Sequence, residues 1–200
     1  SSDLIEGIGD KHVPWIHNVR NTDMVVAVDD ELTIRLMRLF NEQVGRDYLQ
    51  AQGCPVSLTS RLDLLGISGI GNMVATIKFA KYYELTERDV VLTVLTDSME
   101  LYSSRIQELD AERGEYASAD GIRDYEALQS VASDSMKELA FPDRKRVHNL
   151  KYYTWIEQQG RELDELNRQW YDFYDYWKRD GIADGIDQRI QEFNEEVYQP

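Results

Sequence analysis

Apolar residues in the first part of the chain form three short runs separated by stretches with helical spacing. Residues 24–28 (MVVAV) and 90–96 (VVLTVLT) consist of β-forming residues, and residues 62–68 (LDLLGIS) form an apolar run that ends in a glycine turn. Such runs predict buried strands. Because 90–96 carries apolar residues on both faces, it is typical of a parallel sheet covered by helices.

Helical patterns follow or separate these runs. Asp29 is a candidate N-cap, and the apolar residues from Leu32 to Phe40 recur at helical spacing behind it. Further helices are predicted over 44–52, 70–83 and 98–113. Alternating strands and helices at this pitch indicate an α/β fold with right-handed crossovers, so we expect part of a three-layer parallel sheet with flanking helices.

The pattern changes near residue 115. The rest of the chain has no convincing strand, and it is rich in charged and aromatic residues. We therefore expect an α/β domain over 1–115 and a helical C-terminal extension over 116–200. The helices predicted in the extension span 119–139, 143–159, 161–178 and 186–197.

The charge balance limits the classes of partner. With 22 basic and 37 acidic residues the net charge is −15, which argues against binding to nucleic acid or to an anionic membrane surface. No apolar run approaches the roughly 18 residues of a membrane span, and residues 1–7 do not resemble a signal peptide. We expect a cytoplasmic location.

Cysteine and histidine offer little chemistry. Cys54 is the single cysteine, so an internal disulfide is excluded, and a structural thiol is favoured over a nucleophile because no histidine lies near it in the sequence. His12, His17 and His148 are scattered without metal-ligand spacing. The aromatic run 170–177 (WYDFYDYW) favours helix packing or a subunit contact over a ligand site.

A glycine-rich motif, GISGIGN (66–72), follows a predicted strand and opens a predicted helix. Backbone N–H groups at such a junction suit an anion or another hydrogen-bonding ligand. A dinucleotide site is one interpretation, with Asp97 as the ribose-binding acid. The order of the glycines differs from G-x-G-x-x-G, however, and Asp97 lies further along the chain than that motif requires.

Three motifs in order are more informative than any one of them. EGIGDKHVP (6–14) is followed by G-I-S at 66–68 and by a strand ending in T-D-S at 96–98. Over residues 5–109 this order resembles the C-terminal half of the fold-type II pyridoxal-phosphate enzymes, the family of cysteine synthase and cystathionine β-synthase. The resemblance implies β-elimination or β-replacement on an amino-acid substrate such as an activated serine or cysteine.

The resemblance also implies a role for Ser68, whose hydroxyl would bond the pyridine nitrogen of the cofactor. A neutral hydroxyl there leaves the ring unprotonated and favours β-elimination and replacement. An ordinary capping role for Ser68 at the start of the helix stays an equal alternative.

Five further residues match the family's cofactor-binding positions. Gly7, Ile8 and Gly9 match the loop beside cofactor and substrate, and Asp97 and Ser98 match the pair at the strand end near the ring.

The family's Schiff-base lysine and phosphate-binding loop lie upstream of the region matched here. We expect no lysine of this chain to be desolvated and directed toward a site, as an activated lysine must be. The chain is therefore expected to be an inactive C-terminal fragment of an enzyme that binds pyridoxal phosphate when complete. Exposed strand edges predict a homo-oligomer. The alternative is a non-catalytic, acidic α/β-helical interaction module.

Overall fold

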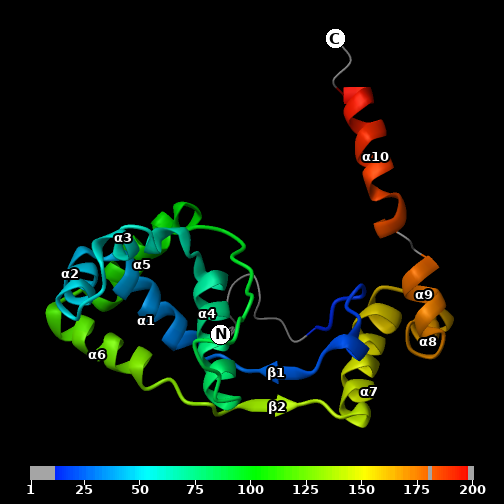
Figure 1. Cartoon of the computed structure of the whole chain (residues 1–200), viewed down its shortest axis with the longest axis horizontal. Coiled ribbons are helices and arrows are strands. Elements are labelled where there is room, and N and C mark those ends of the chain that lie inside the picture. The colour runs from blue at the N-terminus through cyan, green and yellow to red at the C-terminus, as the bar shows by residue number, and fades with distance from the viewer. Residues whose placement is uncertain (1–11, 180–181, 198–200) are drawn as a thin grey trace. The chain divides into compact units, whose positions relative to one another are not determined.

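The computed structural model describes residues 12–179 and 182–197 (Figure 1). Contacts among the described residues divide the chain into two units. The first unit is Met24–Glu138, and the second combines His12–Asp23 with the described residues from Leu139 onward. The two units are described separately below.

Helices make up most of the first unit (Figure 1). Helix α1 packs against α2, α4 and α6, and α6 also packs against α2. We expected residues 118–129, which form α6, to belong to the helical extension. The elements of this unit are β1 (Met24–Val26), α1 (Asp30–Asn41), α2 (Gln43–Ala51), α3 (Val56–Thr59), the 3-10 turn η2 (Leu62–Leu64), α4 (Ile67–Tyr82), the 3-10 turn η3 (Met99–Tyr102), α5 (Ser103–Arg113), α6 (Ser118–Gln129) and β2 (Met136–Glu138).

The start of α1 follows from its sequence. Asp29 is the N-cap, and its carboxylate accepts a hydrogen bond of 3.0 Å from the backbone N–H of Glu31. Asp30 and Glu31 then lie in the first turn, where negative charge is favourable. The predicted N-cap at Asp29 is confirmed.

Large apolar side chains from several helices form the core of the first unit. Because α1 is surrounded by three other helices, its buried residues are not confined to one narrow stripe. The buried cluster consists of Leu36, Met37, Leu39, Phe40, Leu49, Ile67, Ile70, Val74, Met99, Leu109, Tyr116 and Val131.

The predicted three-layer parallel sheet is wrong. The sheet of the described residues has two strands, β1 and β2, which pair antiparallel with Val25 opposite Lys137 (Figure 1). The strand predicted at 24–28 is present as β1, but its partner comes from the region where only helices were expected. The fold of the described part is therefore mainly helical rather than α/β.

The strand predicted over 62–68 is wrong as well. These residues form η2 and the first turn of α4 instead. Ile67, Ile70 and Val74 repeat at intervals of three and four and bury one face of α4. A short apolar run fits a buried strand and a buried helix equally well, and packing against α1 decides in favour of the helix.

Residues 90–96, predicted as the strongest strand, have no regular secondary structure. A strand is stable only when a neighbouring backbone pairs with it. In the described part of the chain, β1 and β2 pair with each other and leave this segment without a strand beside it. Its β-forming residues are consequently exposed to a large extent.

The helix predicted over 119–139 ends early. Helix α6 stops at Gln129, and Ser130–Ser135 lead into β2. Ser135 has a positive φ of 52°, and its carbonyl accepts a hydrogen bond from Ala27 beside β1. This loop turns the chain back along β1, so pairing of the strands overrides the local preference for helix.

The second unit begins with a 3-10 turn, which precedes the first unit in the sequence. Its other elements follow the first unit in the sequence and are helices, as expected for the C-terminal region. One segment is a π-helix, a rare form. The elements are the 3-10 turn η1 (Val19–Asn21), α7 (Phe141–Asn149), the π-helix η4 (Tyr152–Gln158), α8 (Leu163–Tyr171), α9 (Phe173–Arg179) and α10 (Ile182–Val197).

Aromatic residues form much of the interior of the second unit. Trp15, Leu166, Trp170 and Tyr176 are buried. The run 170–177 therefore contributes to packing, while its Tyr171 and Tyr174 are exposed. All four tryptophans of the chain lie in this unit.

The junction of α1 and α2 generates a test of the packing. Gly45 lies against the backbone of α1, and a Cβ at this position would lie 2.2 Å from the carbonyl oxygen of Leu39. Backbone atoms cannot rotate away, so we expect Gly45→Ala to reduce the free energy of unfolding by about 3 kcal/mol. Urea unfolding followed by circular dichroism measures this change.

Gly121→Ala in α6 is the matched control. A Cβ there meets Tyr48 at an ordinary 3.7 Å, and alanine favours the helix, so we expect a gain of about 0.5–1 kcal/mol. Equal stabilities for Gly45→Ala and the unmodified chain would show that α1 and α2 do not approach this closely.

Candidate functional site

The structure brings two of the predicted motifs together at the start of α4. Gly66 is the N-cap of α4, and its N–H donates a 3.0 Å hydrogen bond to the carbonyl of Asp97. The carboxylate of Asp97 lies against Gly66, because a Cβ on residue 66 would be 2.0 Å from Oδ1. Glycine at position 66 therefore permits the close approach of the 96–98 segment to the helix.

The predicted ring-binding residues lie around this junction. Ser68 is in the first turn of α4 and is buried. Ser98 is the N-cap of η3, and Tyr102 of η3 donates its hydroxyl hydrogen to Oδ2 of Asp97 at 2.5 Å. Gly7, Ile8 and Gly9 lie outside the described residues.

The electrostatics of this junction favour a neutral ligand group. The N-terminus of α4 carries the positive end of the helix dipole. Asp97 already places a carboxylate beside it, so a second anion there would be repelled by Asp97. A further anion, such as a phosphate, is therefore disfavoured beside Asp97.

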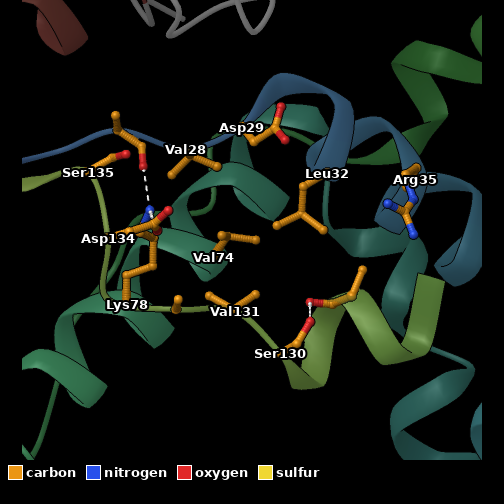
Figure 2. Close-up of a pocket in the computed structure, with 13 residues that line it drawn as sticks. Val28, Asp29, Leu32, Arg35, Val74, Lys78, Ser130, Val131, Asp134 and Ser135 are labelled. Atoms are coloured by element: carbon orange, nitrogen blue, oxygen red, sulfur yellow. Dashed lines mark hydrogen bonds and ion pairs between the residues drawn. The ribbon is translucent and has the colours of Figure 1, made fainter. Parts of the chain in front are cut away.

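A cavity of about 440 Å³ opens elsewhere in the first unit, between α1, α4 and the end of α6 (Figure 2). Val28, Leu32, Val74 and Val131 supply its apolar surface. Figure 2 shows Lys78 and Asp134 at one end and Arg35 at the other. The cavity thus combines an apolar wall with charged groups at both ends.

Lys78 is held in place by two acceptors. Its Nζ donates to the carbonyl of Ala27 and to Oδ1 of Asp134, each at 2.9 Å (Figure 2). The bond from Lys78 lowers the pKa of the exposed Asp134 below its usual range. With its ammonium bonded to a carbonyl and to a carboxylate, Lys78 has a structural role.

The side chain of Lys78 is buried and lines this cavity, whereas the sequence led us to expect no lysine that is desolvated and directed toward a site. The burial of Lys78 could have been inferred from its spacing, because it follows Val74 by four residues on the helix face that begins with Ile67 and Ile70. A lysine on an apolar stripe indicates a buried ion pair, and the partner Asp134 could not be inferred because it comes from the loop before β2.

Lys151 in the second unit is the most deeply buried lysine of the described residues. Burial lowers its pKa to about 8. Lys151 is therefore desolvated, and the contacts of its ammonium decide whether it also faces a site. Its Nζ donates to the carbonyls of Trp15 and His17 and to Oε1 of Gln169, at 2.7–2.8 Å. With all three hydrogens bonded, Lys151 has a structural role.

His148 lies close to this cluster. Its Nε2 is 3.1 Å from the carbonyl of Leu166, and its ring lies against Trp170 with a centroid distance of 5.2 Å. Because a carbonyl can only accept, Nε2 carries the hydrogen of a neutral imidazole. Burial lowers the pKa of His148 to about 4.

Two kinds of site are not found among the described residues. No cluster of three or more histidine, cysteine, aspartate or glutamate side chains is arranged to hold a metal ion there. None of the described helices combines the length and apolar character that crossing a bilayer requires.

Comparison of the chain with models of protein families, with curated proteins and with solved structures found no match. The candidate sites therefore rest on the geometry of the chain itself and on the motifs in its sequence.

The neutral, buried His148 generates a pH test. Its pKa is about 4 in the folded chain and 6.5 when unfolded, so the unfolded chain binds more protons between these values. The second unit should lose up to about 3 kcal/mol of stability from this group as the pH falls from 6.5 to 4. Tryptophan fluorescence during urea unfolding measures it, since all four tryptophans lie in this unit.

His148→Gln retains an N–H donor for Leu166 and removes the titration. The difference in stability between the variant and the unmodified chain should therefore change with pH across this window. Parallel stability curves for the two proteins would refute the assignment.

Proposed function

We propose that this chain forms one wall of the cofactor site of a pyridoxal-phosphate enzyme similar to cysteine synthase. The enzyme would carry out β-elimination or β-replacement on an amino acid such as activated serine or cysteine. Polypeptide outside these 200 residues would supply the Schiff-base lysine and the phosphate-binding loop.

One observation carries the proposal. The G-I-S and T-D-S motifs are about thirty residues apart, yet Gly66 donates to the Asp97 carbonyl at 3.0 Å, and Ser68 lies within the same turn of α4. The order of the motifs and this contact support a common site. The neutral-ligand preference of the junction supports a role for Ser68 toward a ring nitrogen.

The described residues alone do not fit the whole cofactor. Lys78 lies ten residues beyond Ser68 in α4, about 15 Å along the helix axis, and it is bonded to Asp134. Lys81 donates to the carbonyl of Val131, and Lys151 is enclosed by its three acceptors. The ammonium groups of these three lysines are thus already bonded to other acceptors, and the proposal assigns the Schiff-base lysine to polypeptide outside the chain.

Ser68→Ala tests the proposal in the enzyme that contains this chain together with the lysine-bearing polypeptide. We expect a shift in the absorbance of the bound cofactor and a loss of turnover of about tenfold, corresponding to one hydrogen bond. The exposed Ser60 supplies the control variant Ser60→Ala, which should change neither quantity.

The 200-residue chain alone provides the complementary measurement. After incubation with pyridoxal phosphate and reduction with borohydride, mass spectrometry should find no lysine modified stoichiometrically. An unchanged spectrum and turnover in Ser68→Ala would remove the role of Ser68. A stoichiometric adduct with elimination activity in the chain alone would contradict an external lysine.

A second candidate function, a non-catalytic interaction module, is favoured by residues 90–95. Val90 and Leu92 are each 93% exposed, and Val94 and Leu95 are also largely exposed. A contiguous apolar segment of this kind marks an interaction surface. The proposed occupant is a second copy of the chain, because antiparallel pairing of 90–96 with itself places only uncharged residues opposite one another.

The free energy gained by burying the apolar side chains is close to the cost of association, which supports a weak dimer. Burying Val90 and Leu92 on both copies contributes on the order of 6–12 kcal/mol, whereas association costs on the order of 4–15 kcal/mol. Association is therefore expected only at high protein concentration.

Leu92→Lys tests self-association of the chain. The lysine places a charge inside the paired segment, so we expect the concentration-dependent dimer of the unmodified chain to be lost in sedimentation velocity measurements. Leu101→Lys is the control, because Leu101 is an exposed apolar residue outside the segment. A dimer that survives Leu92→Lys, or an unmodified chain that is monomeric at all concentrations, would refute this contact.

A further inference from the structure

Four arginines line a single cavity of about 340 Å³ in the first unit. Arg35 and Arg38 come from α1, Arg113 from the end of α5 and Arg123 from α6. The chain as a whole has 15 more acidic than basic residues, so a local concentration of guanidinium groups runs against its composition. We propose that this cavity, referred to below as the arginine cavity, binds a phosphate group, as inorganic phosphate or as a phosphomonoester.

A buried carboxylate holds two of the arginines in position. Asp124, with 1% of its side chain exposed, accepts from Nε of Arg35 at 2.7 Å, Nε of Arg123 at 3.1 Å and the hydroxyl of Tyr116 at 2.9 Å. Nη2 of Arg35 also donates to the carbonyl of Arg123. These bonds fix both guanidinium groups before any ligand arrives, which reduces the entropy lost on binding.

Arg38 forms the buried part of the arginine cavity. Its Nη2 donates to Oδ1 of Asp110 at 2.6 Å and to the carbonyl of Gly114 at 2.8 Å. Its guanidinium also lies over the ring of Tyr116, with 5.0 Å to the centroid. Arg38 is therefore rigid, and its positive charge is poorly screened by solvent.

The acidic residues of the arginine cavity differ in how firmly they are bound. Asp124 is occupied by three donors, and Asp120 accepts from the N–H of Ala117 at 2.9 Å and pairs with Arg123 at 3.0 Å. Glu31 instead lies at the exposed rim and pairs with Arg113 through two bonds of 2.7 and 3.0 Å. Exposed ion pairs contribute little to stability, so an incoming anion can displace Glu31.

The residues select a phosphate rather than a single carboxylate. A guanidinium offers a planar pair of N–H donors that matches two oxygens of a phosphate or a carboxylate. Guanidinium groups from three separate elements converge on the arginine cavity, which suits the several oxygens and the double charge of a phosphate group. In the absence of ligand, Glu31 would act as an internal competitor for Arg113.

Substitutions of Arg113 and of Glu31, the ion pair at the rim of the arginine cavity, should have opposite effects on phosphate binding and so test the proposal. Inorganic phosphate is titrated into the full chain at constant ionic strength, and binding is measured by calorimetry. Arg113→Gln should weaken binding about tenfold, through loss of a charge-assisted bidentate contact. Glu31→Gln should tighten binding severalfold, because the competing carboxylate is removed. Arg88→Gln changes an exposed arginine outside the arginine cavity and should leave binding unchanged.

The alternative is that the arginine–carboxylate network only stabilises the fold. In that case Arg113→Gln and Glu31→Gln would affect unfolding alike and change phosphate binding in the same direction or not at all. Absence of saturable phosphate binding, or weaker binding in both rim variants, would overturn the proposal.

Titration with phosphoserine in the same proteins distinguishes a preference for a phosphomonoester from binding of free phosphate. Neither result depends on Ser68 or on a cofactor, so failure here leaves the proposed enzyme function untouched.

Discussion

Enclosure of α1 by α2, α4 and α6 is the constraint on which the first unit depends. A helix covered on several sides cannot keep all its polar residues in water, and α1 carries Arg38 into the interior. The buried charge is stabilised by Asp110, by a backbone carbonyl and by the ring of Tyr116. The same enclosure raises the pKa of the neighbouring Glu42, first through burial and then through repulsion by Asp110. The arginine cavity is thus a consequence of how α1 packs.

The two buried lysines show two ways to satisfy an ammonium group. Lys78 pairs with the carboxylate of Asp134, which is itself exposed. A surface carboxylate therefore neutralises the buried ammonium. Lys151 has only neutral oxygen acceptors, and burial lowers its pKa to about 8. Its three bonds join the stretch around Trp15 to α8, two segments of the second unit that are more than 130 residues apart. Removing either acceptor set would leave a charge without compensation in a low-dielectric interior.

The two functional proposals draw on different parts of the same junction. The contact of Gly66 with Asp97 holds one end of the 90–97 segment on α4, and Asn72 of α4 donates to the carbonyl of Val94. The other end exposes Val90 and Leu92. The proposed cofactor wall and the proposed dimer contact therefore involve adjacent residues. The arginine cavity is lined by other residues and has its own chemistry.

The sequence by itself determined the features that depend on neighbours along the chain. The cap at Asp29 and the helices of the C-terminal region follow from spacing and local hydrogen bonding. Only the tertiary structure decided the rest. The run at 90–96 did not become a strand because strands require a partner backbone, and residues 136–138 became one because β1 lies beside them. The pairing of Lys78 with Asp134, the burial of Lys151 and the convergence of the arginines likewise depend on contacts between segments far apart in the sequence, which no local pattern encodes.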